Sequence, residues 1–148
     1  MQNVFDNKNV ISGGCGKLIS GVAMQSGSFY MWGKGEHEKS KRNDHIEFSS
    51  PKLILEQKGV VHVAFGLNHV LILDKMSALY SLGDGNKGCL GHGDTKKRFS
   101  PSLISFFTNK RVIDVSCGDS FSVVIAEVEG DPNERGTYNF NEDGLLDK

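Results

Sequence analysis

The stretch VVHVAFG, residues Val60–Gly66, decides the fold, because its pattern occurs in three versions along the chain. VISGGCG precedes it at Val10–Gly16, and VIDVSCG follows it at Val112–Gly118. Each version begins with two β-branched apolar residues and ends on glycine, and the closing glycines are 50 and then 52 residues apart. A recurrence at this spacing indicates a repeat architecture.

The match extends beyond these stretches. SGVAMQSGSFYMWGKG, at Ser20–Gly35, lies over VLILDKMSALYSLGDG, at Val70–Gly85, with the same offset of 50 residues. SPKLI, at Ser50–Ile54, lies over SPSLI, at Ser100–Ile104. A shared offset at this many sites shows that two whole units are repeated.

The third copy is shorter than the other two. Its strand portion continues to Val128, and we expect an inserted turn over Glu129–Arg135, because Gly, Asp, Pro and Asn favour turns. From Glu127 to Lys148 the chain has seven acidic and two basic residues. The predicted division is an N-terminal extension at 1–9, a first repeat at 10–59, a second repeat at 60–111, and a partial third repeat at 112–148 with the inserted turn and an acidic tail.

Each unit reads as β structure. VVHVAF, VLIL and ALYSLG are short, rich in branched and aromatic residues, and bounded by glycine or polar turns. No segment shows an apolar stripe of helical period over three turns. Units of this length with several short strands predict propeller blades, and a stacked β-solenoid, whose rungs are usually shorter, is the alternative. We therefore predict an all-β fold with about two and a half blades of a propeller-like repeat.

Composition limits the setting and the partners. The chain has 148 residues, enough for one ordinary domain, and 17 basic against 18 acidic residues, so no global charge recruits nucleic acid or a membrane. No apolar run is long enough to cross a bilayer. The three cysteines cannot all pair with one another, and no apolar signal segment follows Met1. These features predict an intracellular protein, in the cytoplasm or the nucleus.

The repeat resembles the regulator-of-chromosome-condensation repeat, with its branched pair, glycine, histidine, Tyr-x-x-Gly turn, G-x-L-G turn and later proline. The second unit matches most fully, at Gly66, His69, Tyr80, Gly83, Gly88, Leu90, Gly91 and Pro101. The first unit has Ile19 at the histidine position and Glu36–Asp44 in place of G-x-L-G, and the third has Phe121 at the histidine position.

The resemblance implies protein partners. Family propellers close with about seven blades, so we expect a piece of a longer protein, or self-association that covers the open sheet edges. The predicted function is a non-enzymatic protein–protein interaction module of a longer scaffold or regulatory protein. The alternatives are a piece of a guanine-nucleotide exchange factor for a small GTPase of the Ran type, or a chromatin-binding propeller. No catalytic role is transferred to any residue.

Glycines in LGDGNKGCLG, at Leu82–Gly91, have the G-x-G-x-x-G spacing of a dinucleotide loop. That fingerprint requires a helix opening on its third glycine, whereas Lys87–Asp94 has no helical pattern. We therefore expect no cofactor, and interpret the recurrent glycines as structural parts of the repeat. They are Gly16, Gly33, Gly66, Gly83, Gly88, Gly91 and Gly118.

No metal or catalytic site is predicted. Cys89, His92 and His69 lack the paired spacing of a zinc site, so Cys89 is expected in a surface turn. Cys15 and Cys117 occupy equivalent positions, and we expect both to pack in the core.

Two basic clusters are the candidate interaction loops. Both lie between the glycine turn and the proline of their units, so they should occupy the same part of each blade. Their side chains either contact an acidic partner or form a solvated surface. The candidate residues are Lys39, Lys41, Arg42, Lys96, Lys97 and Arg98.

Overall fold

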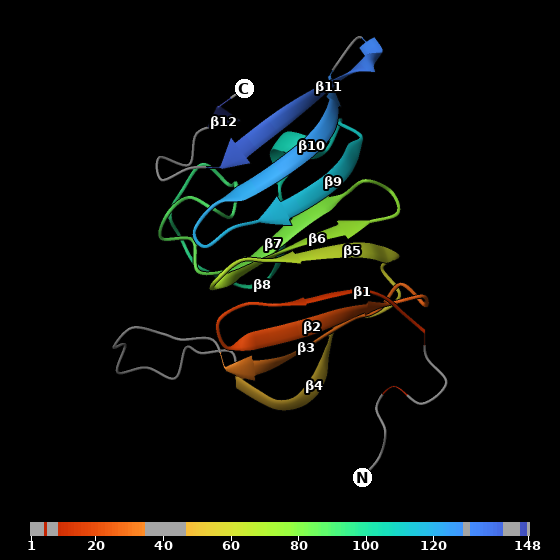
Figure 1. Cartoon of the computed structure of the whole chain (residues 1–148), viewed down its shortest axis with the longest axis vertical. Coiled ribbons are helices and arrows are strands. Elements are labelled where there is room, and N and C mark those ends of the chain that lie inside the picture. Colours follow the sequence, from red (N-terminus) through yellow and green to blue (C-terminus); the bar gives the residue numbers. More distant parts are fainter. Residues whose placement is uncertain (1–4, 6–8, 35–46, 129–130, 141–145, 148) are drawn as a thin grey trace.

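Three antiparallel sheets of four strands each make up the computed structural model, which describes residues 5, 9–34, 47–128, 131–140 and 146–147 (Figure 1). The first sheet contains β1 (Val10–Cys15), β2 (Ile19–Met24), β3 (Phe29–Lys34) and β4 (Glu47–Leu55). The second contains β5 (Val60–Phe65), β6 (His69–Asp74), β7 (Leu79–Gly83) and β8 (Arg98–Leu103). The third contains β9 (Val112–Cys117), β10 (Ser122–Val128), β11 (Asp131–Phe140) and β12 (Leu146–Asp147), and a single 3-10 turn, η1 (Ser105–Phe107), precedes it. The predicted all-β, propeller-type fold is confirmed.

The sheets stack through their first strands. β1 lies beside β5 (Figure 1) and β5 contacts β9, while β4 and β8 are the strands of their sheets farthest from these contacts in the strand order. The hairpin turns are joined along the stack, because the Lys17 N–H donates to the Leu67 carbonyl at 2.8 Å and the Leu67 N–H donates to the Asp119 carbonyl at 3.0 Å. Equivalent turns of the three sheets therefore lie at one end of the molecule.

Strand β6 is buried on both faces, because it lies between two cores. Val70 and Ile72 pack with residues of the first sheet, and Leu71 and Leu73 pack with residues of the third. Alternation along the strand gives each sheet two faces. We call the face that carries Tyr30, Tyr80 or Tyr138 the tyrosine face. The tyrosine face of each later sheet packs against the preceding sheet.

Tyr138 is the third-sheet equivalent of Tyr30 and Tyr80. These tyrosines pair with Val124, Val22 and Ile72, which each lie six residues after the closing glycine of their unit. Tyr30 and Tyr80 follow that glycine by 14 residues and Tyr138 by 20, so the third unit contains six additional residues.

The inserted turn predicted for the third unit is wrong over Asp131–Arg135, because these residues already belong to β11. Val128 pairs with Asp131, while Glu127 pairs with Arg135. The three residues between Asp131 and Arg135 are therefore taken up by an irregularity in the strand pairing, and the other additional residues lengthen the β10–β11 hairpin.

Candidate protein-interaction surface

The loop end of the molecule carries the candidate residues that the structure describes. It consists of the turns Gly16–Leu18, Gly66–Asn68 and Gly118–Phe121 and the long connection Asp84–Lys97 between β7 and β8 (Figure 1). His69 at the start of β6 pairs with Gly83 at the end of β7, which places the connection beside the β5–β6 turn. The strands thus present several loops on a hydrogen-bonded frame, as binding sites often require.

Glycine is required where this connection leaves the sheet. Gly83 has a φ of +117°, and a Cβ atom there would lie 2.4 Å from the Asn68 carbonyl oxygen. Gly88 has a φ of +71°, and a Cβ atom at Gly85 would lie 2.3 Å from the Lys96 carbonyl oxygen. Left-handed backbone and close approach both favour glycine, so the G-x-G-x-x-G spacing has a structural cause.

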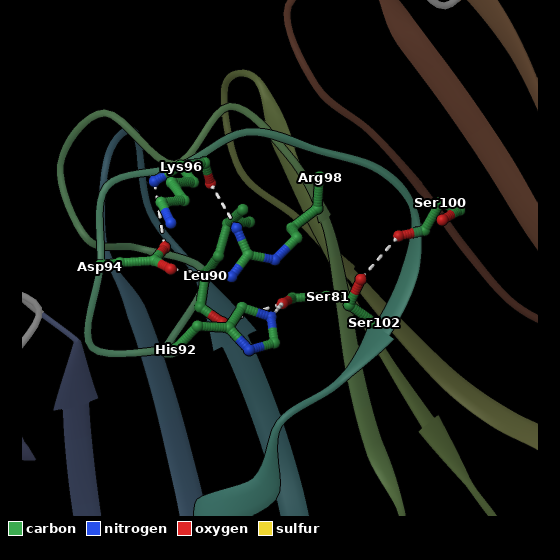
Figure 2. Close-up of polar contacts among 8 residues, drawn as sticks. All are labelled: Ser81, Leu90, His92, Asp94, Lys96, Arg98, Ser100 and Ser102. Carbon is green, nitrogen blue, oxygen red and sulfur yellow. Dashed lines mark hydrogen bonds and ion pairs between the residues drawn. The ribbon is translucent and has the colours of Figure 1, made fainter.

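Ser81 and His92 hold the connection against the second sheet (Figure 2). The Ser81 hydroxyl donates to the Leu90 carbonyl at 2.8 Å and lies 2.9 Å from Nε2 of His92. Because the hydroxyl proton is already used, Nε2–H of the imidazole is the donor. Burial, followed by the charge of Arg98, lowers the pKa of His92, so the imidazole is neutral at pH 7.

Arg98 is partly neutralised by Asp94 (Figure 2). Its guanidinium donates to Oδ2 of Asp94 at 3.0 Å and to the Lys96 carbonyl at 3.1 Å, and the Lys96 N–H donates to Oδ1 of Asp94 at 3.0 Å. The hydrogen bond from Arg98 lowers the pKa of Asp94. The structure brings Lys96, Lys97 and Arg98 together, but with less net positive charge than the sequence suggests. The candidates Lys39, Lys41 and Arg42 lie outside the described residues.

His69 connects the second and third sheets, which the sequence did not indicate. It is 1% exposed, and its Nε2 lies 2.8 Å from the Ser122 hydroxyl, which donates to the Cys89 carbonyl at 2.9 Å. Burial lowers the pKa of His69 to about 4, although the charges of Asp119 and Asp84 act in the opposite direction. A neutral imidazole therefore joins the two sheets and the loop.

The cysteines differ from their predicted environments. Cys89, expected in a surface turn, is buried because its Sγ turns inward and donates to the Asp84 carbonyl at 3.2 Å. Cys117 Sγ donates to the Ala64 carbonyl of the preceding sheet. Among the described residues no sheet precedes the first one, so Cys15, expected in the core, is exposed. Burial raises the pKa of Cys89 to about 12 and that of Cys117 to about 11. Both thiols are therefore protonated and unreactive at neutral pH.

A small hollow lies at the loop end, where the second and third sheets meet. Its lining is mostly polar and comprises Asn68, His69, Asp84, Asn86, Lys87, Cys89, Asp119 and Ser120. Two apolar side chains in the adjoining turns, Leu67 and Phe121, are exposed to 36% and 53%. Across the described parts of the chain, no three His, Cys, Asp or Glu side chains lie close enough to hold a metal ion. The hollow thus combines carboxylates, amides and neighbouring apolar surface.

Comparison with known proteins identifies the repeat. The family model "Regulator of chromosome condensation (RCC1) repeat" matches residues 77–125, from the turn before β7 into β10. The chain carries regulator-of-chromosome-condensation repeats. Of the seven glycines predicted to be structural, five lie at equivalent places in these units: Gly16, Gly66 and Gly118 follow first strands, and Gly33 and Gly83 lie in third strands. Gly88 and Gly91 lie in the β7–β8 connection.

Relatives with these repeats are much longer than this chain. Human E3 ubiquitin-protein ligase HERC2 is 30% identical over 78% of this chain and 2% of its own length. The X-linked retinitis pigmentosa GTPase regulator of Canis lupus familiaris is 32% identical over 76% of this chain and 12% of its own length. The fold is similar to that of Prp20p from Saccharomyces cerevisiae, with a TM-score of 0.66, 21% identity, and coverage of 94% of this chain and 32% of that one.

Among the described residues, no helix has the length and apolar character needed to span a membrane.

Proposed function

We propose that this chain is a non-enzymatic protein-interaction module of a longer intracellular scaffold or regulatory protein. The loop end carries the proposal, because exposed Leu67 and Phe121 flank a polar hollow there. Interfaces commonly place exposed apolar side chains, aromatic ones among them, next to polar groups that can form hydrogen bonds. The hydrogen bonds of His69 and His92 fix the surrounding loops, so binding would require little reorganisation.

Chemistry within the loop end supports a binding role rather than catalysis. Its buried thiol, Cys89, and its partly buried thiol, Cys117, are held protonated. Its two histidines are hydrogen-bonded to serines that already donate to backbone carbonyls. A nucleophile needs an adjacent base that can accept its proton. Ser81 and Ser122 instead direct their protons into the fold, and we propose that no cofactor takes part.

The relatives support protein partners of two kinds. Prp20p has binding properties toward Gsp1p and histones, and the canine relative is named as a GTPase regulator. We propose a small GTPase of the Ran type or chromatin as the partner classes to test first. Lys96 and Lys97 are the reason to keep chromatin as the second candidate, because positively charged loops attract phosphate-rich or acidic partners.

Binding variants at the two ends of the molecule test this proposal. Leu67→Ser combined with Phe121→Ser changes the loop end, while Met76→Ser changes a more exposed apolar side chain in the opposite β6–β7 turn. With the full-length parent, affinity for a purified small GTPase or for histones should fall about tenfold in the double variant and stay unchanged in the control. Equal affinities in both variants would contradict the loop-end assignment.

Two further measurements separate the partner classes. Exchange-factor activity requires that the parent accelerate nucleotide release from the GTPase. Chromatin binding should weaken steeply with salt and with Lys96→Glu plus Lys97→Glu. Salt-insensitive binding that survives this charge reversal would remove the basic loop from the interface.

A further inference from the structure

The tyrosine face of the first sheet differs from its two equivalents, because no described sheet packs on it. In the second sheet the tyrosine face meets the first sheet through Phe29 and Met31, and in the third it meets the second sheet. On the first sheet, Tyr30 and Trp32 stay only partly buried, and Val10 at the edge of this sheet is 51% exposed. Of the equivalent side chains, Leu82 and Tyr138 are 1% and 5% exposed, while Tyr80 is partly buried like Tyr30. The burial of Leu82 and Tyr138 indicates that this face is suited to contact with another apolar group.

Phe5 lies on this face. Its ring meets that of Tyr30 edge-on, with centroids 5.6 Å apart and an interplanar angle of 87°. The same ring lies 6.2 Å from Trp32 at 52°. Both distances are typical of favourable aromatic pairs. One phenyl ring, from 25 residues upstream of Tyr30, therefore covers the two aromatic residues of the open face.

We propose that the tyrosine face of the first sheet is a docking surface and that Phe5 of the same chain occupies it as a plug. Continuity with the other junctions supports this occupant. Phe29 and Met31 supply the large apolar side chains that cover the tyrosine face of the second sheet, and Phe5 supplies a side chain of the same kind to the first. Any protein that docks there must displace Phe5, so the contact limits access to the face.

Trp32 reports this contact directly, because it is the chain's single tryptophan. In Phe5→Ala, the Trp32 emission of the full chain should shift to longer wavelength and become more accessible to acrylamide. Phe5→Leu, which retains an apolar side chain, should give an intermediate shift. Phe121→Ala is the matched control, since it removes an exposed phenylalanine from the β9–β10 turn and should leave the emission unchanged. Circular dichroism verifies that each variant keeps its β structure.

Two results would overturn the proposal. The first is unchanged Trp32 emission in folded Phe5→Ala. The second is emission of the wild-type chain that varies with protein concentration together with dimerisation by sedimentation, which would show that a second copy covers the face. Self-association that appears only in Phe5→Ala would support the plug, because it would show that the uncovered face recruits an apolar partner.

Discussion

Two junctions join the three sheets, and they differ at equivalent positions. The junction of the first and second sheets has an apolar pair there, and the junction of the second and third sheets has a polar pair. In the first junction Ile19 and Val70 are buried in one apolar cluster. In the second junction the same positions hold His69 and Ser122, which are hydrogen-bonded at 2.8 Å. The repeat therefore tolerates either an apolar or a polar pair, provided that both members have the same character.

Backbone hydrogen bonds establish that these positions are equivalent. The N–H of each closing glycine donates to the carbonyl three residues later, at 2.7 Å for Ile19, 2.8 Å for His69 and 2.9 Å for Phe121. This backbone hydrogen bond is the same in all three units, while the side chain at the position three residues after the glycine differs. The polar pair also binds the β7–β8 connection, because Ser122 donates to Cys89. The second junction thus couples two sheets and a loop, whereas the first excludes water with apolar contacts.

Lowering the pH should have the largest effect, because it should destabilise the second junction and leave the first unchanged. The folded-state pKa of His69 is lowered to about 4, from 6.5 in the unfolded chain, so the unfolded chain binds a proton first as the pH falls. The stabilisation is complete above pH 6.5 and is lost between pH 6.5 and 4, by roughly 3 kcal/mol at pH 4. Urea unfolding at several pH values measures it. The double variant His69→Ile, Ser122→Val should lose this part of the pH dependence, and an unchanged profile would contradict the assignment.

Ser122→Val should have the next largest effect. It leaves the buried Nε2–H of His69 and the Cys89 carbonyl without the hydroxyl, at a cost of about 1–3 kcal/mol in the free energy of unfolding at pH 7. Adding His69→Ile reproduces the pair of the first junction and should recover most of the loss. Chemical denaturation of the single and double variants gives the coupling energy. Strictly additive effects would show that the two side chains do not interact.

The reciprocal change in the first junction should cost less. Ile19→His places an imidazole opposite Val70, where no hydroxyl is available, and a buried polar group without a partner is unfavourable. We expect a loss of roughly 1–2 kcal/mol, because Ile19 is 6% exposed and a ring there can turn partly toward water. Val70→Ser in addition should restore stability. If Ile19→His is neutral by thermal unfolding, the two junctions do not differ in the way described.

The sequence predicts the sheets better than the contacts between them. Equal spacing placed Ile19, His69 and Phe121 at one position, because repeated strands must share a register. It did not reveal the bond from His69 to Ser122, since a contact across 53 residues depends on how two sheets pack. It also hid Tyr138, because six additional residues interrupt the spacing and turn-forming residues occupy a strand.

The candidate loop shows the same limit. Three basic residues are visible in the sequence, but the pairing of Arg98 with Asp94 depends on the path of the connection. The inward turn of Cys89 likewise follows from the hydrogen bond to Asp84 that this path permits. The sequence thus predicts where the loop lies. The net charge of the loop and the burial of Cys89 depend on the folded path of the backbone, which the sequence does not reveal.

Asp94→Asn should give the smallest change in stability, because the pair lies outside both junctions. The side chains of Arg98 and Asp94 keep 22% and 32% exposure, and such surface pairs contribute about 0.2–1 kcal/mol. Removing the carboxylate leaves Arg98 and the neighbouring lysines with one more net positive charge. Affinity for an acidic partner should therefore rise at low salt while the unfolding free energy hardly changes. Glu56→Gln, at an exposed position between β4 and β5, is a control with the same change in net charge. A loss above that range would instead place the pair among the structural contacts, and the basic loop would then be part of the frame rather than of the binding surface.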